Sequence, residues 1–405
     1  MILSIFFVAF QRPLFIHSNS TAMSSTIKRR DWFKQTSFAT LGLGLSLRSF
    51  ANDVEGLPQK KFDSQKGLIN LSSNENPYGI SPKSKQAIIE MIPYANRYSF
   101  NIDSLKNCQQ TIAKYYGVNE ENILLTAGSG MVLDLVPRYF YKTGANVVAA
   151  DPTFFILPAT AKKLGYNLNL VPVGADRGIN LSGMLSAINN DTQLIYLVNP
   201  NNPTGTLLKP AAMKQFCEEA SKKAPVLIDE AYLDFLDAPD NESMIPLAAS
   251  NPNVMVTRTF SKIHGMAGLR IGYVISHPSR IKQLEQTYFT ESQVAISDLT
   301  LTAALASLQD EEHRLQAKQK NAAARDYTVK SLKEMKLNPI PSVTNFILFP
   351  LGNNYEGNFA DFMLTKNIYL RSNTYFGEKC CRVSVGTMEE MQQFIKVMKE
   401  TWKQS

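Results

Sequence analysis

Short, continuous apolar runs alternate with longer amphipathic stretches from about residue 105 to residue 300. The apolar runs predict buried strands over residues 122–126, 146–150, 194–198, 226–229 and 253–257. The stretches between them predict helices, such as the one over residues 211–223. Strands that are apolar on both faces are typical of a parallel sheet with helices on either side. The pattern therefore predicts an α/β domain with a mostly parallel sheet.

The pattern changes near residue 300. Residues 300–336 are rich in Ala, Lys, Gln and Glu and predict one long helix, and strand-like runs follow at 345–349 and 381–385. A last helix is expected over residues 388–402, with Thr387 as its N-cap. We therefore expect a smaller α+β domain at this end. The predicted organisation is a leader over 1–51, an N-terminal arm over 52–95, a large domain over 96–300 and a small domain over 301–405.

Composition narrows the class of protein. A hydrophobic content of 44% and a charged content of 19% are typical of a globular enzyme. The net charge is +7, but residues 1–51 carry +5 of it, so the body predicts no nucleic-acid partner. No apolar stretch approaches the roughly 20 residues that a membrane-spanning helix needs. The four cysteines lack the paired spacing of a metal site, and Cys380 and Cys381 are expected to be unpaired, with one of them buried.

The N-terminus resembles a twin-arginine export signal. Arg29 and Arg30 are followed by Trp32, Phe33 and Lys34, and a moderately apolar stretch covers residues 38–47. Small residues at 49 and 51 predict cleavage after residue 51, and Met23 is the expected start, with residues 1–22 as an extension. This predicts a periplasmic or exported protein. The alternative is a basic tail on a protein that stays in the cytoplasm.

Polar groups follow three of the predicted strands at the point where each strand ends. Asn202 comes after the strand at 194–198, Asp229 ends the strand at 226–229, and residues 259–262 follow the strand at 253–257. Ligands of such sheets bind beyond the carboxyl ends of the strands. We therefore expect these groups to meet at one site.

The chemistry of these groups points to pyridoxal 5′-phosphate (PLP). The amine of Lys262 could form a Schiff base with the cofactor aldehyde and later carry a proton. Asp229, at the end of an apolar strand, needs a cationic partner, and a protonated pyridine nitrogen is one. Asn202 and Tyr232 could both reach the phenolic oxygen of the ring. Taken singly, Lys262 could be a solvated lysine, Asp229 a helix cap and Asn202 part of a turn.

A second set of residues suits a phosphate and a carboxylate. The turn Gly128, Ser129, Gly130 precedes a predicted helix, where free backbone N–H groups favour an anion. Phe154 could lie against the pyridine ring or belong to the core. Arg382, in an alternating strand, could clamp a carboxylate or be an exposed edge charge. The side chains that could complete the phosphate site are those of Thr259, Ser261 and Arg270.

Together these motifs resemble fold-type I PLP enzymes of the aspartate aminotransferase superfamily, and within it the histidinol-phosphate aminotransferases. The resemblance covers about residues 68–402. Phe154 stands where this group usually has a tyrosine, and Met131 follows Gly130 where acidic residues are usual. The motifs that carry the resemblance lie at residues 74–79, 96–98, 199–205, 229–232, 258–262, 267–272 and 382–387.

The resemblance implies a role for each site residue. Lys262 would hold PLP, Asp229 would pair with its ring nitrogen, and Asn202 and Tyr232 would bind its phenolic oxygen. Arg382 would bind the substrate carboxylate or the equivalent end of the substrate. Tyr78 and Arg371 match positions that line the substrate pocket, and Arg371 could contact a substrate phosphate. Tyr98 would reach the phosphate bound by a neighbouring subunit, which implies a homodimer with shared active sites. The phosphate ligands would be Ser129, Thr259, Ser261 and Arg270.

The function expected from the sequence is that of a PLP-dependent aminotransferase. It would move an amino group between an amino acid, or an amine like histidinol phosphate, and a 2-oxo acid such as 2-oxoglutarate. A decarboxylase acting on a phosphorylated amino acid, or a C–S lyase, would use the same scaffold. A non-catalytic PLP-binding sensor is an alternative of another class, although proton-transfer residues such as Lys262 would be superfluous in it.

Overall fold

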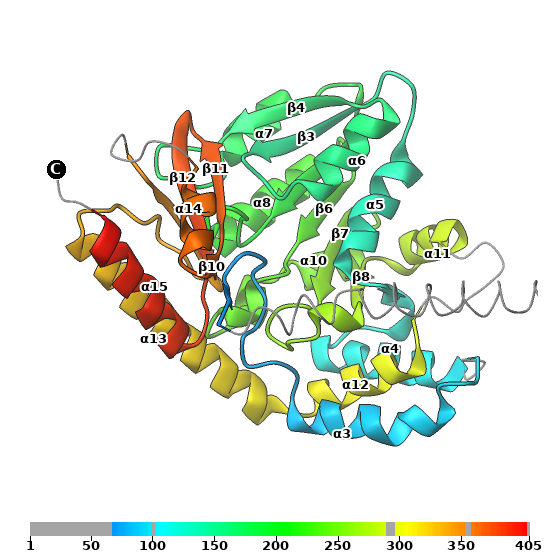
Figure 1. Cartoon of the computed structure of the whole chain (residues 1–405). Helices are drawn as coiled ribbons and strands as arrows, with labels where there is room; N and C mark the ends of the chain where they lie inside the picture. The colour runs from blue at the N-terminus through cyan, green and yellow to red at the C-terminus, as the bar shows by residue number, and fades with distance from the viewer. Residues whose placement is uncertain (1–66, 99–101, 289–295, 353–357, 403–405) are drawn as a thin grey trace, which may run out of the picture. The chain divides into compact units, whose positions relative to one another are not determined.

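A computed structural model describes residues 67–98, 102–288, 296–352 and 358–402 (Figure 1). The expected export signal, its cleavage point and the alternative start all lie outside the described residues. Residues 68–405 form one compact unit. Within the described ranges, no helix combines the length and apolar character needed to cross a membrane.

The largest element is a seven-stranded sheet with the order β2-β8-β7-β6-β5-β3-β4. Neighbouring strands from β7 through β4 are parallel, whereas β8 runs antiparallel to both β7 and β2. The mostly parallel sheet predicted from the apolar runs is therefore confirmed. The strands are β2 (Ile123–Thr126), β3 (Asn146–Asp151), β4 (Asn167–Pro172), β5 (Thr192–Val198), β6 (Val226–Asp229), β7 (Val254–Thr259) and β8 (Gly272–Ile275).

Helices pack against both faces of this sheet. One face buries Tyr196 and Leu227 together with residues of helix α5, and the other buries Ile195 and Ile228 with residues of α4 and α8. These two apolar cores explain why the strands are apolar on both sides. The helical elements up to residue 308 are α3 (Pro82–Met91), η1 (Ile92–Tyr94), α4 (Ile102–Tyr116), η2 (Glu120–Asn122), α5 (Ser129–Phe140), α6 (Ile156–Leu164), α7 (Leu181–Ala187), α8 (Pro210–Ala220), η3 (Leu233–Phe235), α9 (Pro239–Glu242), α10 (Ile245–Ser250), η4 (Ala267–Leu269), α11 (Pro278–Tyr288) and α12 (Asp298–Leu308).

The C-terminal part has its own sheet and its own core. An antiparallel sheet of order β11-β12-β9 packs with helices α13 and α15, which lie side by side in Figure 1. Thr387 caps α15 as predicted, and Glu390 completes a capping box. The elements are α13 (Glu311–Glu334), β9 (Phe346–Pro350), α14 (Phe359–Thr365), β10 (Ile368–Tyr369), β11 (Arg371–Tyr375), β12 (Glu378–Ser384) and α15 (Met388–Thr401).

One short N-terminal strand joins this C-terminal part. Strand β1 (Ile69–Asn70) pairs in parallel with β10, and Leu71 belongs to the C-terminal core. The chain then passes to the large sheet, where its next residues enter the site described below. This arrangement ties the start of the compact unit to its end.

Some details differ from the sequence-based expectations. The long helix expected over 300–336 is two helices, because the chain turns at Gln309 and Asp310 between α12 and α13. Both Cys380 and Cys381 are buried, since β12 is the middle strand of its sheet and is covered on both faces. The predicted boundary at residue 300 falls inside α12, whose Leu301 packs in the core of the large sheet. The division into domains stays a prediction.

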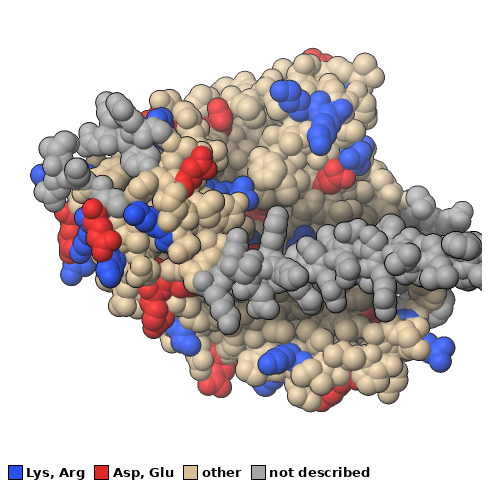
Figure 2. Space-filling model, viewed as in Figure 1, with Lys and Arg blue, Asp and Glu red and all other residues tan. Residues whose placement is uncertain are grey.

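Charges are distributed over the face drawn in Figure 2. Basic and acidic side chains both lie along its edges, and neither forms a continuous band.

Candidate active site

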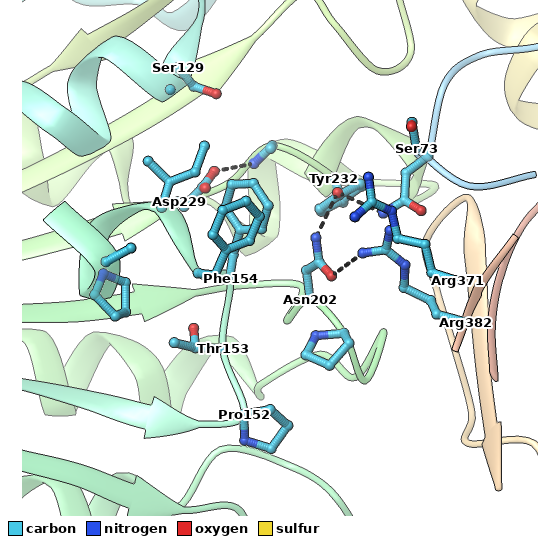
Figure 3. A pocket seen from close by; sticks show the side chains of 18 of the residues that line it. Ser73, Ser129, Pro152, Thr153, Phe154, Asn202, Asp229, Tyr232, Arg371 and Arg382 are labelled. Atoms are coloured by element: carbon cyan, nitrogen blue, oxygen red, sulfur yellow. Dashed lines mark hydrogen bonds between the residues drawn. The ribbon is translucent and has the colours of Figure 1, made fainter. Parts of the chain in front are cut away.

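A cavity of about 820 Å³ lies at the carboxyl end of the parallel strands. Its wall includes residues that follow β3, β5, β6 and β7, as well as the start of α5 and residues of β11 and β12 (Figure 3). The three predicted groups, Asn202, Asp229 and Lys262, all line this cavity. Sequence reasoning thus placed them correctly at one edge of the sheet.

Asp229 is the buried acid of the site. It ends β6, is only 3% exposed, and its Oδ1 accepts a hydrogen bond from the backbone N–H of Ala231 at 3.1 Å. Burial raises its pKa to about 7, although the Ala231 N–H and the charge of Lys262 act in the opposite direction. A buried carboxyl of this kind gains from a cationic partner within the cavity.

Lys262 brings its amine to the same cavity from the turn after β7. Its Nζ donates to the backbone oxygen of Asn74 at 3.1 Å and to that of Ser73 at 3.3 Å. The amine also lies 5.5 Å from the centre of the Tyr232 ring. Neutral carbonyl oxygens are weaker partners than a carboxylate, so the amine can be released to a ligand at modest cost.

The Tyr232 hydroxyl receives two amide N–H groups. Asn202 donates to it at 3.1 Å, and Asn74 donates at 3.0 Å. All three side chains are buried, with exposures of 4% or less. Because both amides converge on one oxygen, they fix where the hydroxyl of Tyr232 points. Asn74 was missing from the predicted site, although its motif was noted. Its unusual feature is a backbone φ of 54°, which cannot be recognised from the sequence.

A cradle suited to an anion lies beside Lys262. Thr259 and Ser261 share a hydrogen bond of 3.0 Å between their hydroxyls, and Arg270 Nη1 donates to Ser261 Oγ at 3.4 Å. Ser129 begins α5, so the backbone N–H groups of that helix N-terminus face this position. Gly128 precedes it at a φ of 85°. A Cβ at residue 128 would lie 2.3 Å from Arg270 Nη2, so only glycine leaves the guanidinium its place.

Two arginines enter the cavity from the C-terminal sheet. Arg371 and Arg382 are register partners on β11 and β12. Arg371 Nε and Arg382 Nη2 each donate to the backbone oxygen of Ser72 at 2.9 Å, and Arg382 Nη1 donates to Asn202 Oδ1 at 2.8 Å (Figure 3). The Nε of Arg382 is buried and has no hydrogen-bond partner among the described residues. An unpaired N–H on a buried guanidinium is what an entering carboxylate would satisfy.

An ion pair supports the site from the opposite face of the sheet. Glu230 follows Asp229, and Arg258 precedes Thr259, so both stand one residue away from a site residue. Arg258 Nη2 lies 2.9 Å from Glu230 Oε2, and Arg258 Nη1 lies 2.8 Å from Asp234 Oδ1. The pair is buried and joins the ends of β6 and β7.

Of the remaining predicted residues, some line the cavity and others do not. Phe154 and Gly130 line the cavity, and Figure 3 shows the Phe154 ring facing it. Tyr78 is not among the residues of the cavity wall and packs against the cluster that contains Tyr232. Tyr98 is 77% exposed and is not part of this chain's own cavity. Its predicted role concerns a neighbouring subunit.

No metal site accompanies these groups within the described ranges. His, Cys, Asp and Glu side chains do not gather there in threes or more at positions that could hold an ion. The cysteines of the described chain are free and buried.

Comparison with known proteins gives the family. The model for aminotransferase class I and II matches residues 66–398. A histidinol-phosphate aminotransferase of Moorella thermoacetica is 32% identical over 83% of this chain and 86% of its own length. Histidinol-phosphate aminotransferase 1 of Bacillus cereus is 35% identical over 82% and 88%. A crystal structure of the Sinorhizobium meliloti histidinol-phosphate aminotransferase with pyridoxal 5′-phosphate has a TM-score of 0.77 at 26% identity, covering 85% of this chain and 93% of that one.

The donor set of the cavity fits PLP. Asp229 is a buried acid that could pair with the ring nitrogen, and the cluster of Asn202, Asn74 and Tyr232 could bind the phenolic oxygen. The glycine-backed cradle at Arg270 suits a phosphate, and Lys262 supplies the amine. The geometry and the family agree: the chain belongs to the class I and II aminotransferases and is a PLP-dependent enzyme.

Proposed function

We propose that this aminotransferase takes its amino group from an amine that carries an anionic group, such as histidinol phosphate or glutamate, and passes it to a 2-oxo acid such as 2-oxoglutarate. The pairing of Arg371 with Arg382 carries the proposal. Both guanidinium groups donate to one backbone oxygen, that of Ser72, and both line the cavity. Two cations at one wall suit substrates with anionic groups, and the relatives' names fit such a substrate.

The two arginines differ in setting, and this suggests a division of labour. Arg382 is partly buried and is held by Asn202, close to the cofactor groups. Arg371 is exposed. We assign Arg382 to the carboxylate of an amino acid or 2-oxo acid, and Arg371 to the phosphate ester of an amine such as histidinol phosphate.

The reaction needs few moving groups. PLP, when bound, supplies an aldehyde that takes up the substrate amine and a protonated ring that draws electrons from the substrate α-carbon. Asp229 would hold the proton on the ring nitrogen. Tyr232 and Asn202 would orient the ring through its phenolic oxygen. Lys262 would take the proton from the α-carbon and deliver it to the neighbouring cofactor carbon.

The test compares substrates and variants. Purified protein loaded with PLP is given histidinol phosphate, the same amine without phosphate, or glutamate, together with a 2-oxo acid. We expect kcat/KM to favour the phosphorylated amine. Arg371→Gln should lower kcat/KM for that amine by about 10- to 100-fold and change it little for the unphosphorylated one, since a charge-assisted hydrogen bond contributes about 1.5–3 kcal/mol. Release of carbon dioxide from glutamate without consumption of the 2-oxo acid would instead identify a decarboxylase.

We further propose a homodimer with shared active sites. Ile92, Tyr94 and Tyr98 are more than half exposed and lie close together in sequence, which supports an apolar contact surface at the end of α3. Mixing tests it. Lys262→Ala and Tyr98→Ala chains are each expected to be nearly inactive, and a mixed dimer would regain one site with both residues intact. A mixture no more active than its parts would remove the proposed sharing.

Export is also proposed, on the order of charged, apolar and small residues before residue 52. The full-length chain expressed in a bacterium with the twin-arginine pathway should appear in the periplasm with a mature end at residue 52. Replacing Arg29 and Arg30 by lysine should keep the protein in the cytoplasm. A periplasmic product that still begins at Met23 would contradict the cleavage.

A further inference from the structure

Tyr196 lies beneath the site and no role follows for it from the predicted cofactor contacts. It belongs to β5, next to β6, and its register partner is Leu227. Asp229 follows Leu227 by two residues, so Tyr196 and Asp229 are diagonal neighbours on the same face of the sheet. The side chain is completely buried in the core that α5 covers.

The hydroxyl of Tyr196 is an unpaired polar group in this core. Among the described residues it has no hydrogen-bond partner at ordinary length, and Asp229 is the carboxylate close enough to interact with it. Leaving a buried hydroxyl unpaired costs about 1–3 kcal/mol, so a tyrosine at this position calls for an acceptor. A phenylalanine would fill the same volume without that cost.

Asp229 is the acceptor within reach. Burial, and next the charge of Asp229, raise the pKa of Tyr196 well above its usual range, so the hydroxyl keeps its proton. In turn the hydroxyl is among the groups that lower the pKa of Asp229 against the effect of burial. The described residues give Asp229 one hydrogen bond of ordinary length, from the N–H of Ala231 to Oδ1.

The other groups around Asp229 cannot take this place. The charge of Lys262 lowers the pKa of Asp229, but Lys262 itself is needed to react with the cofactor. Glu230 raises it, and the first turn of α5, which packs over this face, has no acidic residue. The Tyr232 hydroxyl, which accepts the amides of Asn74 and Asn202, would use its own proton on the phenolic oxygen of PLP.

We propose that the Tyr196 hydroxyl donates a hydrogen bond to the Asp229 carboxylate and holds it, charged, toward the ring nitrogen of PLP. Tyr196 is thus a positioning residue, which acts on the cofactor through Asp229. The bond is made when the carboxylate turns toward the cofactor. The proposal concerns cofactor binding and is independent of which amine the enzyme uses.

The test is the affinity for PLP of the full chain, freed of cofactor and titrated across a pH series around the pKa of Asp229, which is about 7. Tyr196→Phe should move the midpoint of this dependence upward by about one pH unit. At neutral pH the affinity should fall about tenfold, the effect of one lost hydrogen bond to a charged group.

Tyr166→Phe is the matched control. Tyr166 is buried in the same core, but its hydroxyl donates to the backbone oxygen of Pro137 at 2.8 Å. This variant should lose stability without moving the midpoint. An unmoved midpoint in Tyr196→Phe, or an equal shift in both variants, would overturn the proposal.

A double-mutant cycle separates positioning from packing. In an Asp229→Asn background, Tyr196→Phe should leave the remaining PLP affinity nearly unchanged, because the charged acceptor is already gone. The same loss of affinity with and without Asp229 would show that Tyr196 acts on the core alone, and the proposal would then fail.

Discussion

The guanidinium of Arg258 lies 2.9 Å from the carboxylate of Glu230, and neither side chain is more than 1% exposed. The pair faces away from the cofactor cavity, yet its members are sequence neighbours of Asp229 and Thr259. The ion pair affects the site indirectly, because it fixes the ends of β6 and β7 relative to each other.

Breaking this pair should destabilise the protein strongly. Arg258→Met leaves the charge of Glu230 buried without its main partner, and such losses cost about 3–5 kcal/mol. We expect a matching fall in the free energy of unfolding by urea and weaker PLP binding. Glu218→Gln removes an exposed i,i+4 pair with Lys214 and serves as the control, with an expected change below about 0.5 kcal/mol. Equal effects of the two variants would contradict this account.

The stability of the cofactor-free protein should depend on the ionisation of Asp229. Its pKa is about 7 in the folded chain, against an ordinary value of 3.8. Between these values the folded protein binds a proton that the unfolded chain has released. The stabilisation that comes from this bound proton is therefore fully present below the lower pKa and is lost as pH rises to about 7. To isolate it, the free energy of unfolding of Asp229→Asn is subtracted from that of the unaltered protein at each pH. The difference should change by about 4 kcal/mol at most, and a flat difference would argue against the raised pKa.

Gly128→Ala should weaken cofactor binding. The new Cβ would lie 2.3 Å from Arg270 Nη2, and the φ of 85° is unfavourable for alanine. We expect an affinity for PLP at least about tenfold lower, since the strain is of the order of 1–3 kcal/mol. Gly268→Ala, at an exposed position with open space around its Cβ, should bind PLP normally. Loss of binding in both variants would point to a general disturbance of the loop.

Lys262→Ala should separate binding from turnover. In the proposed mechanism the amine of Lys262 reacts with the cofactor and carries the proton, and the variant keeps Asp229, Tyr232 and the phosphate cradle. We expect turnover to fall by at least about 10²- to 10⁴-fold while PLP is still retained non-covalently. Cofactor content after dialysis and single-turnover rates measure the two effects. Turnover near that of the unaltered protein would exclude Lys262 as the reacting amine.

Sequence reasoning succeeded where the physical signal is local. The strands that end at Val198, Asp229 and Thr259 are continuous apolar runs, and their parallel arrangement follows from burial on both faces. It missed β4, because this edge strand is half exposed and its apolar residues alternate with asparagine and proline. It also missed β8, a short antiparallel strand whose residues follow directly after the motif at 267–272.

The site residues divide in the same way between local and long-range signals. Lys262, Asp229 and Asn202 could be found because each lies at or after the end of a predicted strand. Asn74 and Tyr196 could not, because their roles depend on a backbone conformation and on contacts across strands. A pattern along the chain carries no signal for either.

The pairing of β1 with β10 has a consequence for how the enzyme is made. Ile69 lies opposite Ile368, and the residues just after β1 provide the oxygens that hold Lys262, Arg371 and Arg382. The first residues of the compact unit to leave the ribosome therefore cannot reach their final place until β10, near the end of the chain, has been synthesised. The cavity is complete only after nearly the whole chain has been synthesised, which makes cofactor capture a post-translational event.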